Sequence, residues 1–121
     1  YRLATARRVL SADKVWDAAA IVALSDGANI ALDMSLGFNF SVTLAGNRTL
    51  DNPTNTKVGQ AGMIRVSQDG TGTRTLAYGT SYKFVDGTAP VIDATASRIS
   101  YLSYFVYTST EIVVSMLRGV R

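Results

Sequence analysis

The stretch FNFSVTLAGNRTLDNPTN, residues 38–55, decides the fold because apolar and polar side chains alternate along its first half. A period of two places successive side chains on opposite faces of a strand, so one face here is apolar and the other small and polar. The apolar face consists of Phe38, Phe40, Val42 and Leu44. A one-residue shift in pairing would expose the whole set, so the register is strongly specified. The chain then turns at residues 46–47 and 52–55, where Pro53 restricts the backbone.

The same alternation recurs through the rest of the chain. It predicts strands over residues 30–34, 63–66, 74–77, 82–84, 99–107 and 111–117. The last two form a predicted hairpin that turns through Thr108–Thr110. Asp-Gly pairs at 26–27, 69–70 and 86–87 lie between apolar runs and predict hairpins or other turns, because glycine adopts positive φ at little cost. Short strands separated by frequent turns predict an all-β fold, either a jelly-roll-like domain or a β-sandwich.

The first twenty residues differ in character from the remainder. They contain four of the twelve basic residues and the only tryptophan, with few glycines. A chain of 121 residues is the size of one domain. We therefore predict a β domain at 21–121, preceded by an N-terminal arm at 1–20 that attaches it to another surface. The candidate attachment residues are Arg7, Arg8, Val9, Leu10 and Trp16.

The predicted strand at residues 99–107 carries large side chains on both faces. Tyr101, Phe105 and Tyr107 alternate with Leu102, Tyr104 and Val106. One face of an antiparallel sheet usually meets water, so burial of both requires a second covering layer or a neighbouring subunit. The pattern predicts a subunit interface, with Tyr101, Tyr104, Phe105 and Tyr107 as its candidate residues.

The composition argues against most catalytic sites. The chain has no histidine and no cysteine, so it lacks Ser-His-Asp and Cys-His pairs and the usual ligands of zinc. We expect no enzyme activity, no metal and no cofactor. A net charge of +3 spread along the chain is typical of a solvated surface rather than a nucleic-acid site. No apolar run approaches the roughly 20 residues that span a bilayer, so we expect no membrane partner either.

The acidic loops are more consistent with turns than with sites. The segment DGTGTR, residues 69–74, resembles a phosphate-binding loop, but it lacks the following Gly-Lys-Ser/Thr, the third glycine of GxGxxG and the extra carboxylates of a calcium loop. Asp51, Asp69, Asp86 and Asp93 all lie in predicted turns, where aspartate commonly bonds its own backbone. A glycosidase-like pair of carboxylates is the less favoured alternative.

The aromatic side chains leave a second function open. Packing in the core or at an interface is the favoured interpretation, but Tyr78 and Tyr82 are candidates for stacking on sugar rings. A carbohydrate-binding module for host adsorption is therefore the main alternative to a structural role. A polysaccharide depolymerase is a further alternative, disfavoured by the missing histidine and by the absence of an internal repeat or repetitive solenoid pattern.

A linked series of motifs carries a family resemblance. The series comprises GNRTL (46–50), NPTN (52–55), K-x-GQ-x-G (57–62), QDGTGTRTL (68–76) and an aromatic-Lys-Phe segment (82–84). Together these motifs resemble a domain of tailed-bacteriophage structural proteins, of the tail fibre, head fibre or capsid decoration type, over residues 25–117. The resemblance implies a β-rich subunit of the virion surface, a homotrimer, that docks onto other capsid or tail proteins through its arm. It implies no catalytic residues.

Overall fold

The alternating stretch forms a strand, as its pattern predicts, and strands dominate this computed structural model, which describes residues 16, 17 and 19–120. In chain order the elements are β1 (Ile21–Ala23), β2 (Asn29–Ile30), η1 (Met34–Leu36), β3 (Asn39–Leu44), β4 (Arg48–Leu50), β5 (Ala61–Gln68), β6 (Leu76–Tyr78), β7 (Tyr82–Lys83), η2 (Val85–Gly87), β8 (Ile99–Thr108) and β9 (Glu111–Val120). Both η elements are short 3₁₀ turns. Within the described residues, no helix has the length and apolar character needed to cross a membrane. The all-β prediction is confirmed.

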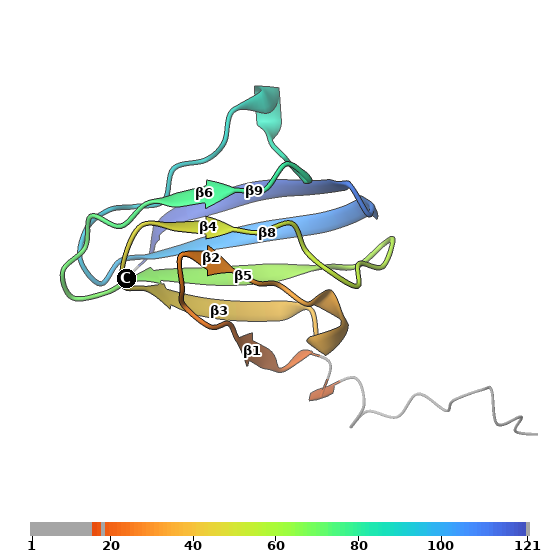
Figure 1. Cartoon of the computed structure of the whole chain (residues 1–121), viewed down its shortest axis with the longest axis horizontal. Coiled ribbons are helices and arrows are strands. Elements are labelled where there is room, and N and C mark those ends of the chain that lie inside the picture. Colours follow the sequence, from red (N-terminus) through yellow and green to blue (C-terminus); the bar gives the residue numbers. More distant parts are fainter. Residues whose placement is uncertain (1–15, 18, 121) are drawn as a thin grey trace, which may run out of the picture.

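The strands form two sheets that face each other. The larger sheet has six strands in the order β1-β3-β5-β8-β9-β7, and the smaller has three in the order β2-β4-β6. Figure 1 shows the small sheet lying over one face of the large one. We call that covered side of the large sheet its inner face and the opposite side its outer face.

From β1 to β6 the chain passes alternately between the two sheets. Each of the strands β3 to β6 therefore pairs in parallel with the second strand before it in the sequence. The result is a coil of three turns, as in a short parallel β-helix. Side chains in the connecting loops tie the turns together: Arg48 donates two hydrogen bonds of 2.8 Å to Asp26, and the backbone N–H of Thr75 donates one of 3.1 Å to Asn47. Arg48 and Asn47 belong to the GNRTL motif, so that motif holds successive turns of the coil together through hydrogen bonds.

The topology does not confirm a jelly roll, which is built from antiparallel strands, because here β1, β3 and β5 pair in parallel, as do β2, β4 and β6. The Asp-Gly pairs lie outside the strands, as turn signals should, but none of them closes a hairpin. Those at 26–27 and 69–70 lie in connections that carry the chain from one sheet to the other, and 86–87 lies in η2. The coil was not expected either, since the sequence shows no repeat. Paired residues are 18 positions apart in β1 and β3 and 20 in β2 and β4, but 24 in β3 and β5 and 28 in β4 and β6, so successive turns differ in length.

The predicted hairpin at the end of the chain is confirmed. β8 and β9 are antiparallel neighbours, with Tyr104 opposite Val114 and Thr108 opposite Glu111 at the turn. β8 also pairs antiparallel with β5, so the hairpin extends the sheet beyond the last turn of the coil. β7 completes that edge by pairing in parallel with β9.

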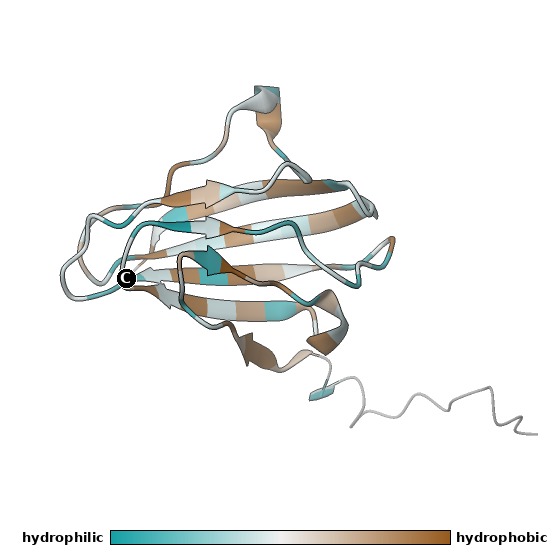
Figure 2. Ribbon diagram, viewed as in Figure 1, coloured by the Kyte–Doolittle hydropathy of each residue, from teal (hydrophilic) through white to brown (hydrophobic). Residues whose placement is uncertain are grey.

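The core lies between the inner face of the large sheet and the small sheet. Its largest fully buried side chains include Phe40 from β3, Leu50 from β4 and Leu102 from β8. Hydrophobic segments recur along the strands of both sheets in Figure 2. The apolar set predicted for β3 contributes Phe40, Val42 and Leu44 to this core, while Phe38 lies half-buried just before the strand.

Candidate interaction surface

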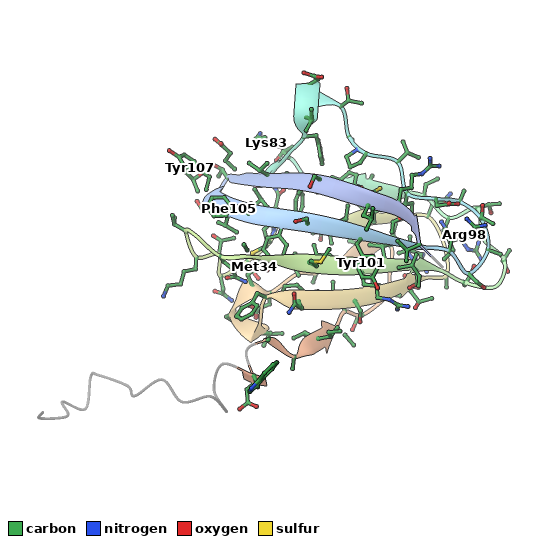
Figure 3. The ribbon with its side chains drawn as sticks, turned by 180° about the vertical axis from the view of Figure 1, so that it is seen from behind. Met34, Lys83, Arg98, Tyr101, Phe105 and Tyr107 are labelled. Carbon is green, nitrogen blue, oxygen red and sulfur yellow. The ribbon has the colours of Figure 1, made fainter. Side chains whose placement is uncertain are left out.

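The outer face of the large sheet carries several large apolar side chains that no other described part of the chain covers. Alternation along β8 sends Leu102, Tyr104 and Val106 into the core, each no more than 3% exposed. The intervening positions place Phe105 (44% exposed) and Tyr107 (60% exposed) on the outer face. Figure 3, which shows this face, has Tyr101, Phe105 and Tyr107 spread along β8.

Neighbouring strands enlarge the apolar area. Strand pairing places Met63 of β5 and Val113 of β9 next to β8 on the same face. The exposed apolar side chains of the outer face are Ile21, Met63, Phe105, Tyr107, Val113 and Leu117, with the half-buried Tyr101 among them. Exposed apolar side chains gathered on one face define the candidate interaction surface. We call these seven side chains the outer patch.

Charged groups are few on this face. Arg65, Lys83 and Glu111 share it, because they occupy the outward positions of β5, β7 and β9. Lys83 donates a hydrogen bond of 3.0 Å to the carbonyl oxygen of Thr80. Arg65 forms no ion pair with any described residue. Depletion of charge around an apolar centre is the composition of a protein–protein interface.

The predicted interface residues divide between the two faces. Tyr101, Phe105 and Tyr107 lie together in the outer patch, whereas Tyr104 lies in the core. The hydroxyl group of Tyr104 donates to the carbonyl oxygen of Phe38 at 2.8 Å and accepts from the side-chain amide of Gln60 at 3.2 Å. Burial raises the pKa of this phenol. Tyr104 therefore belongs to the scaffold that holds β8, not to its exposed face.

Sequence reasoning missed the outer-patch residues that lie on other strands, namely Ile21, Met63, Val113 and Leu117. The alternation in 111–117 was a usable signal for the two residues of β9. Met63 and Ile21 are recognisable only once pairing is known, because Ile21 lies in a strand of three residues and the outward neighbours of Met63 in β5 are small or polar.

The N-terminal candidates are only partly within the described structure. Arg7, Arg8, Val9 and Leu10 lie outside the described residues. Trp16 is described, and its side chain is 73% exposed. The attachment role of the arm therefore stays a prediction.

The two tyrosines considered for sugar binding form an aromatic cluster with Phe84. Tyr78 contacts Phe84 edge-on with ring centroids 4.9 Å apart, and Tyr82 at 6.1 Å. The hydroxyl group of Tyr82 donates to the carbonyl oxygen of Asp51 at 2.8 Å, and that of Tyr78 to Pro90 at 3.0 Å. Burial raises the pKa of Tyr82 and raises that of Tyr78 to about 12. Tyr82 is only 3% exposed, so its ring offers no face to a ligand.

Tyr78 does line a groove. The groove has a volume of about 420 Å³ and runs between β6, the edge strand of the small sheet, and residues 89–94. Its walls are largely apolar, with Leu76, Val91 and Ile92 among them, and Arg74 also lines it. The groove is shaped for an apolar or aromatic group more than for a phosphate or a metal.

The loop at residues 69–74 satisfies its own polar groups. The carboxylate of Asp69 accepts hydrogen bonds from the backbone N–H groups of Thr71 and Gly72 and pairs with the guanidinium group of Arg74 at 2.9 Å. These bonds, that of Arg74 first, lower the pKa of Asp69. The backbone N–H groups of Thr71 and Gly72 are therefore already hydrogen-bonded and do not form an anion site. The described residues also contain no group of three or more acidic side chains placed to hold a metal.

The comparisons with known proteins agree with this picture. No curated protein and no solved structure is significantly similar to the chain. Residues 37–110, more than half of the chain, match the family described as "Putative phage tail fibre C-terminal domain". The matched range runs from the start of β3 to the turn between β8 and β9, and so includes the last two turns of the coil. The chain therefore belongs to this family of phage tail fibre domains and is a structural component of a bacteriophage virion.

Proposed function

We propose that this chain is a non-enzymatic tail fibre subunit that self-associates through its outer patch, as a homotrimer, and forms part of the virion surface. The observation that carries the proposal is the two-sided apolar character of β8. Its inner side chains are buried by the chain's own small sheet, and its outer ones, Phe105 and Tyr107, have no covering layer among the described residues.

The physics of association supports this assignment. Burial of apolar surface contributes about 25 cal/mol per Å², and a standard interface removes roughly 1,600 Å² from water in total. Only the part that exceeds the cost of lost translational and rotational freedom appears as affinity. A sheet face with aromatic anchors such as Tyr101 and Phe105 is suited to supply that excess, because such side chains lose little conformational entropy on burial.

The N-terminal arm, residues 1–20, is proposed to dock the subunit onto another virion protein. The exposed indole ring of Trp16 supports this, since a large aromatic side chain on the surface is a typical interface anchor. Deletion of residues 1–17, which removes Trp16, is expected to leave self-association intact and to prevent incorporation into particles. Incorporation of the truncated chain at the normal level would contradict the docking role.

Phe105→Asp tests the self-association proposal. A charge at the centre of the outer patch leaves the core untouched, so we expect the variant to keep the circular dichroism spectrum of the parent and to sediment as a monomer. The parent chain is expected to sediment as a trimer at micromolar concentration. Thr49→Asp is the control, because Thr49 lies on β4 of the small sheet, next to the buried Leu50 and on the opposite side of its strand, so it faces away from the core and from the large sheet, and its replacement should leave the trimer intact.

A stable, well-folded monomer of the parent chain at micromolar concentration would contradict self-association through the outer patch. An unchanged trimer in Phe105→Asp would place the contact elsewhere on the molecule.

The groove beside β6 supports a second candidate, a carbohydrate-binding module for host adsorption. The ring of Tyr78 and its partner Phe84 form part of the groove wall, and aromatic faces stack on sugar rings. Binding of the chain to host polysaccharide, lost when Ala77→Trp fills the groove, is the expected result for this candidate. Absence of binding to an array of bacterial polysaccharides would remove it.

A further inference from the structure

Residues 84–92, which we call the projecting loop, extend away from both sheets next to β7. In Figure 1 this loop, which contains η2, stands clear of the body at the top of the view. Its side chains Val85 and Val91 are each 72% exposed. Asp86, at the tip, adopts the left-handed conformation with φ 55°.

The projecting loop has a defined shape despite its exposure. The backbone N–H of Gly87 donates to the carbonyl oxygen of Phe84 at 3.0 Å, and that of Thr88 to Val85 at 3.1 Å. At its base, Phe84 packs on Tyr78, whose hydroxyl group bonds the carbonyl oxygen of Pro90. Such a loop presents Val85 and Asp86 together at little further entropic cost, which favours binding.

A hollow lies on the outer face near the opposite edge of the large sheet. Its volume is about 280 Å³, and its lining includes Ile21, Met63, Tyr101 and Arg65. Three of these side chains are apolar or aromatic, while Arg65 brings a positive charge without an ion-pair partner among the described residues. A matching ligand would carry an apolar group beside a carboxylate.

The projecting loop and the hollow cannot meet within one molecule. The loop follows β7, the last strand in the sheet order, and extends away from the sheet, whereas Met63 and Arg65 of the hollow lie on β5, three strand positions from β7. Three strand spacings of about 4.8 Å amount to about 14 Å. Any contact between them must therefore join two copies of the chain.

We propose that the projecting loop of one copy docks into the hollow of the next, with Val85 against Ile21 and Met63, and Asp86 paired with Arg65. The inference rests on the proposed self-association and specifies how it is arranged. Asp86 forms no ion pair with a described residue of its own copy, so both charged partners are available. The apolar contact supplies affinity, and the charge pair sets the orientation.

The arrangement has a consequence for symmetry. Two closed arrangements satisfy every loop and every hollow. In a three-membered ring the loop of each copy enters the hollow of the next, which is a heterologous contact. In a two-fold dimer the two copies exchange loops reciprocally, because an isologous contact places residue i of one copy on residue j of the other and the reverse. We expect the ring, and disulfide-linked trimers, which a two-fold dimer cannot give, distinguish the two.

Cysteine cross-linking tests the contact directly, because the chain has no native cysteine. The double variant Val85→Cys with Met63→Cys, oxidised at micromolar concentration, is expected to give disulfide-linked dimers and trimers on a non-reducing gel. A disulfide needs Cα atoms closer than about 7 Å, so no bridge within one copy competes. The control Val85→Cys with Thr43→Cys places the second thiol elsewhere on the outer face, on β3, and should remain unlinked.

Charge reversal provides an independent measure. Arg65→Glu is expected to weaken association by at least about tenfold, and the double variant Arg65→Glu with Asp86→Lys to recover most of that loss. Lys83→Glu, a reversal on the same face outside the hollow, should have a smaller effect. Circular dichroism of each variant confirms that the fold is retained.

The outcomes separate this inference from the function on which it rests. A parent trimer that is disrupted by Phe105→Asp but shows no cross-link and no charge rescue would overturn the loop-and-hollow contact and leave self-association standing. A parent monomer would overturn both.

Discussion

The two faces of β8 differ in what covers them, although both are built from large side chains. On the inner face, Leu102 and Val106 are completely buried between the two sheets. On the outer face, Phe105 and Tyr107 stay about half exposed. The inner face is completed by the chain's own small sheet, whereas the outer face has no covering layer among the described residues. A strand that is apolar on both sides therefore supports the proposal of a second layer of assembly beyond the single chain.

β3 shows that this two-sidedness is not a general property of the sheet. Its inner side chains, including Phe40 and Val42, are buried, but its outward positions are the small polar residues Asn39, Ser41 and Thr43. The outer patch is concentrated on β8 and β9, with Met63 and Ile21 extending it toward the hollow. On a face that only contacts solvent, we would expect the outward positions of β8 and β9 to carry small polar residues, as those of β3 do.

The largest expected effect is on the inner face of β3. Phe40→Asp places a carboxylate in a site that is 1% exposed, so it combines the loss of a large core side chain with the burial of an unpaired charge. We expect a loss of more than about 4 kcal/mol in the free energy of unfolding, enough to abolish folding. Thr43→Asp on the outer side of the same strand should fold normally. Circular dichroism and solubility distinguish the two, and a soluble, folded Phe40→Asp would mean that the buried face has been misassigned.

Much of this contrast could be predicted from the sequence. The alternation in residues 38–44 identified β3 and its buried side chains, and the alternation in 99–107 separated Tyr101, Phe105 and Tyr107 from Leu102 and Val106. The hairpin turn at Thr108–Thr110 followed from the same reasoning. These features depend on local periodicity, which a single sequence contains.

The coil and the placement of Tyr104 and Tyr82 depend on pairing between distant residues. An Asp-Gly turn serves a sheet-to-sheet connection as well as a hairpin, and here Asp26 bonds Arg48, 22 positions away, in place of its own turn. The unequal lengths of successive turns removed any repeat that would have revealed stacking. The hollow requires β1, β3, β5 and β8 together, so no local pattern could have indicated it.

An intermediate loss in the free energy of unfolding is expected at alkaline pH, because buried tyrosines ionise more readily in the unfolded chain. Burial holds the folded-state pKa of Tyr82, Tyr78 and Tyr104 above the value near 10 that a phenol has in an unfolded chain. Below about pH 10 both states are protonated and the stabilisation is complete. As the pH rises further, the unfolded chain loses its phenolic protons first, so the free energy of unfolding falls until the folded pKa is passed, about 12 for Tyr78.

Urea unfolding at about pH 8 and about pH 11 measures this loss. Tyr82→Phe should be less stable than the parent at the lower pH, because it lacks the hydrogen bond to Asp51, and should lose less stability between the two values. An unchanged free energy of unfolding across the range in the parent would show that these hydroxyl groups ionise freely in the folded protein.

The smallest expected change in the free energy of unfolding comes from removing one hydroxyl group on each face of β8. Tyr104→Phe removes a buried hydroxyl that bonds the carbonyl oxygen of Phe38 and the amide of Gln60, so we expect a loss of about 1 kcal/mol in the free energy of unfolding. Tyr101→Phe removes a hydroxyl that has no hydrogen bond to a described residue, and its effect should be within about 0.5 kcal/mol. Both are best measured in the Phe105→Asp background, where self-association no longer contributes. Equal losses at the two positions would mean that the outer hydroxyl is as constrained as the inner one, and that the outer face of β8 is already completed within a single chain.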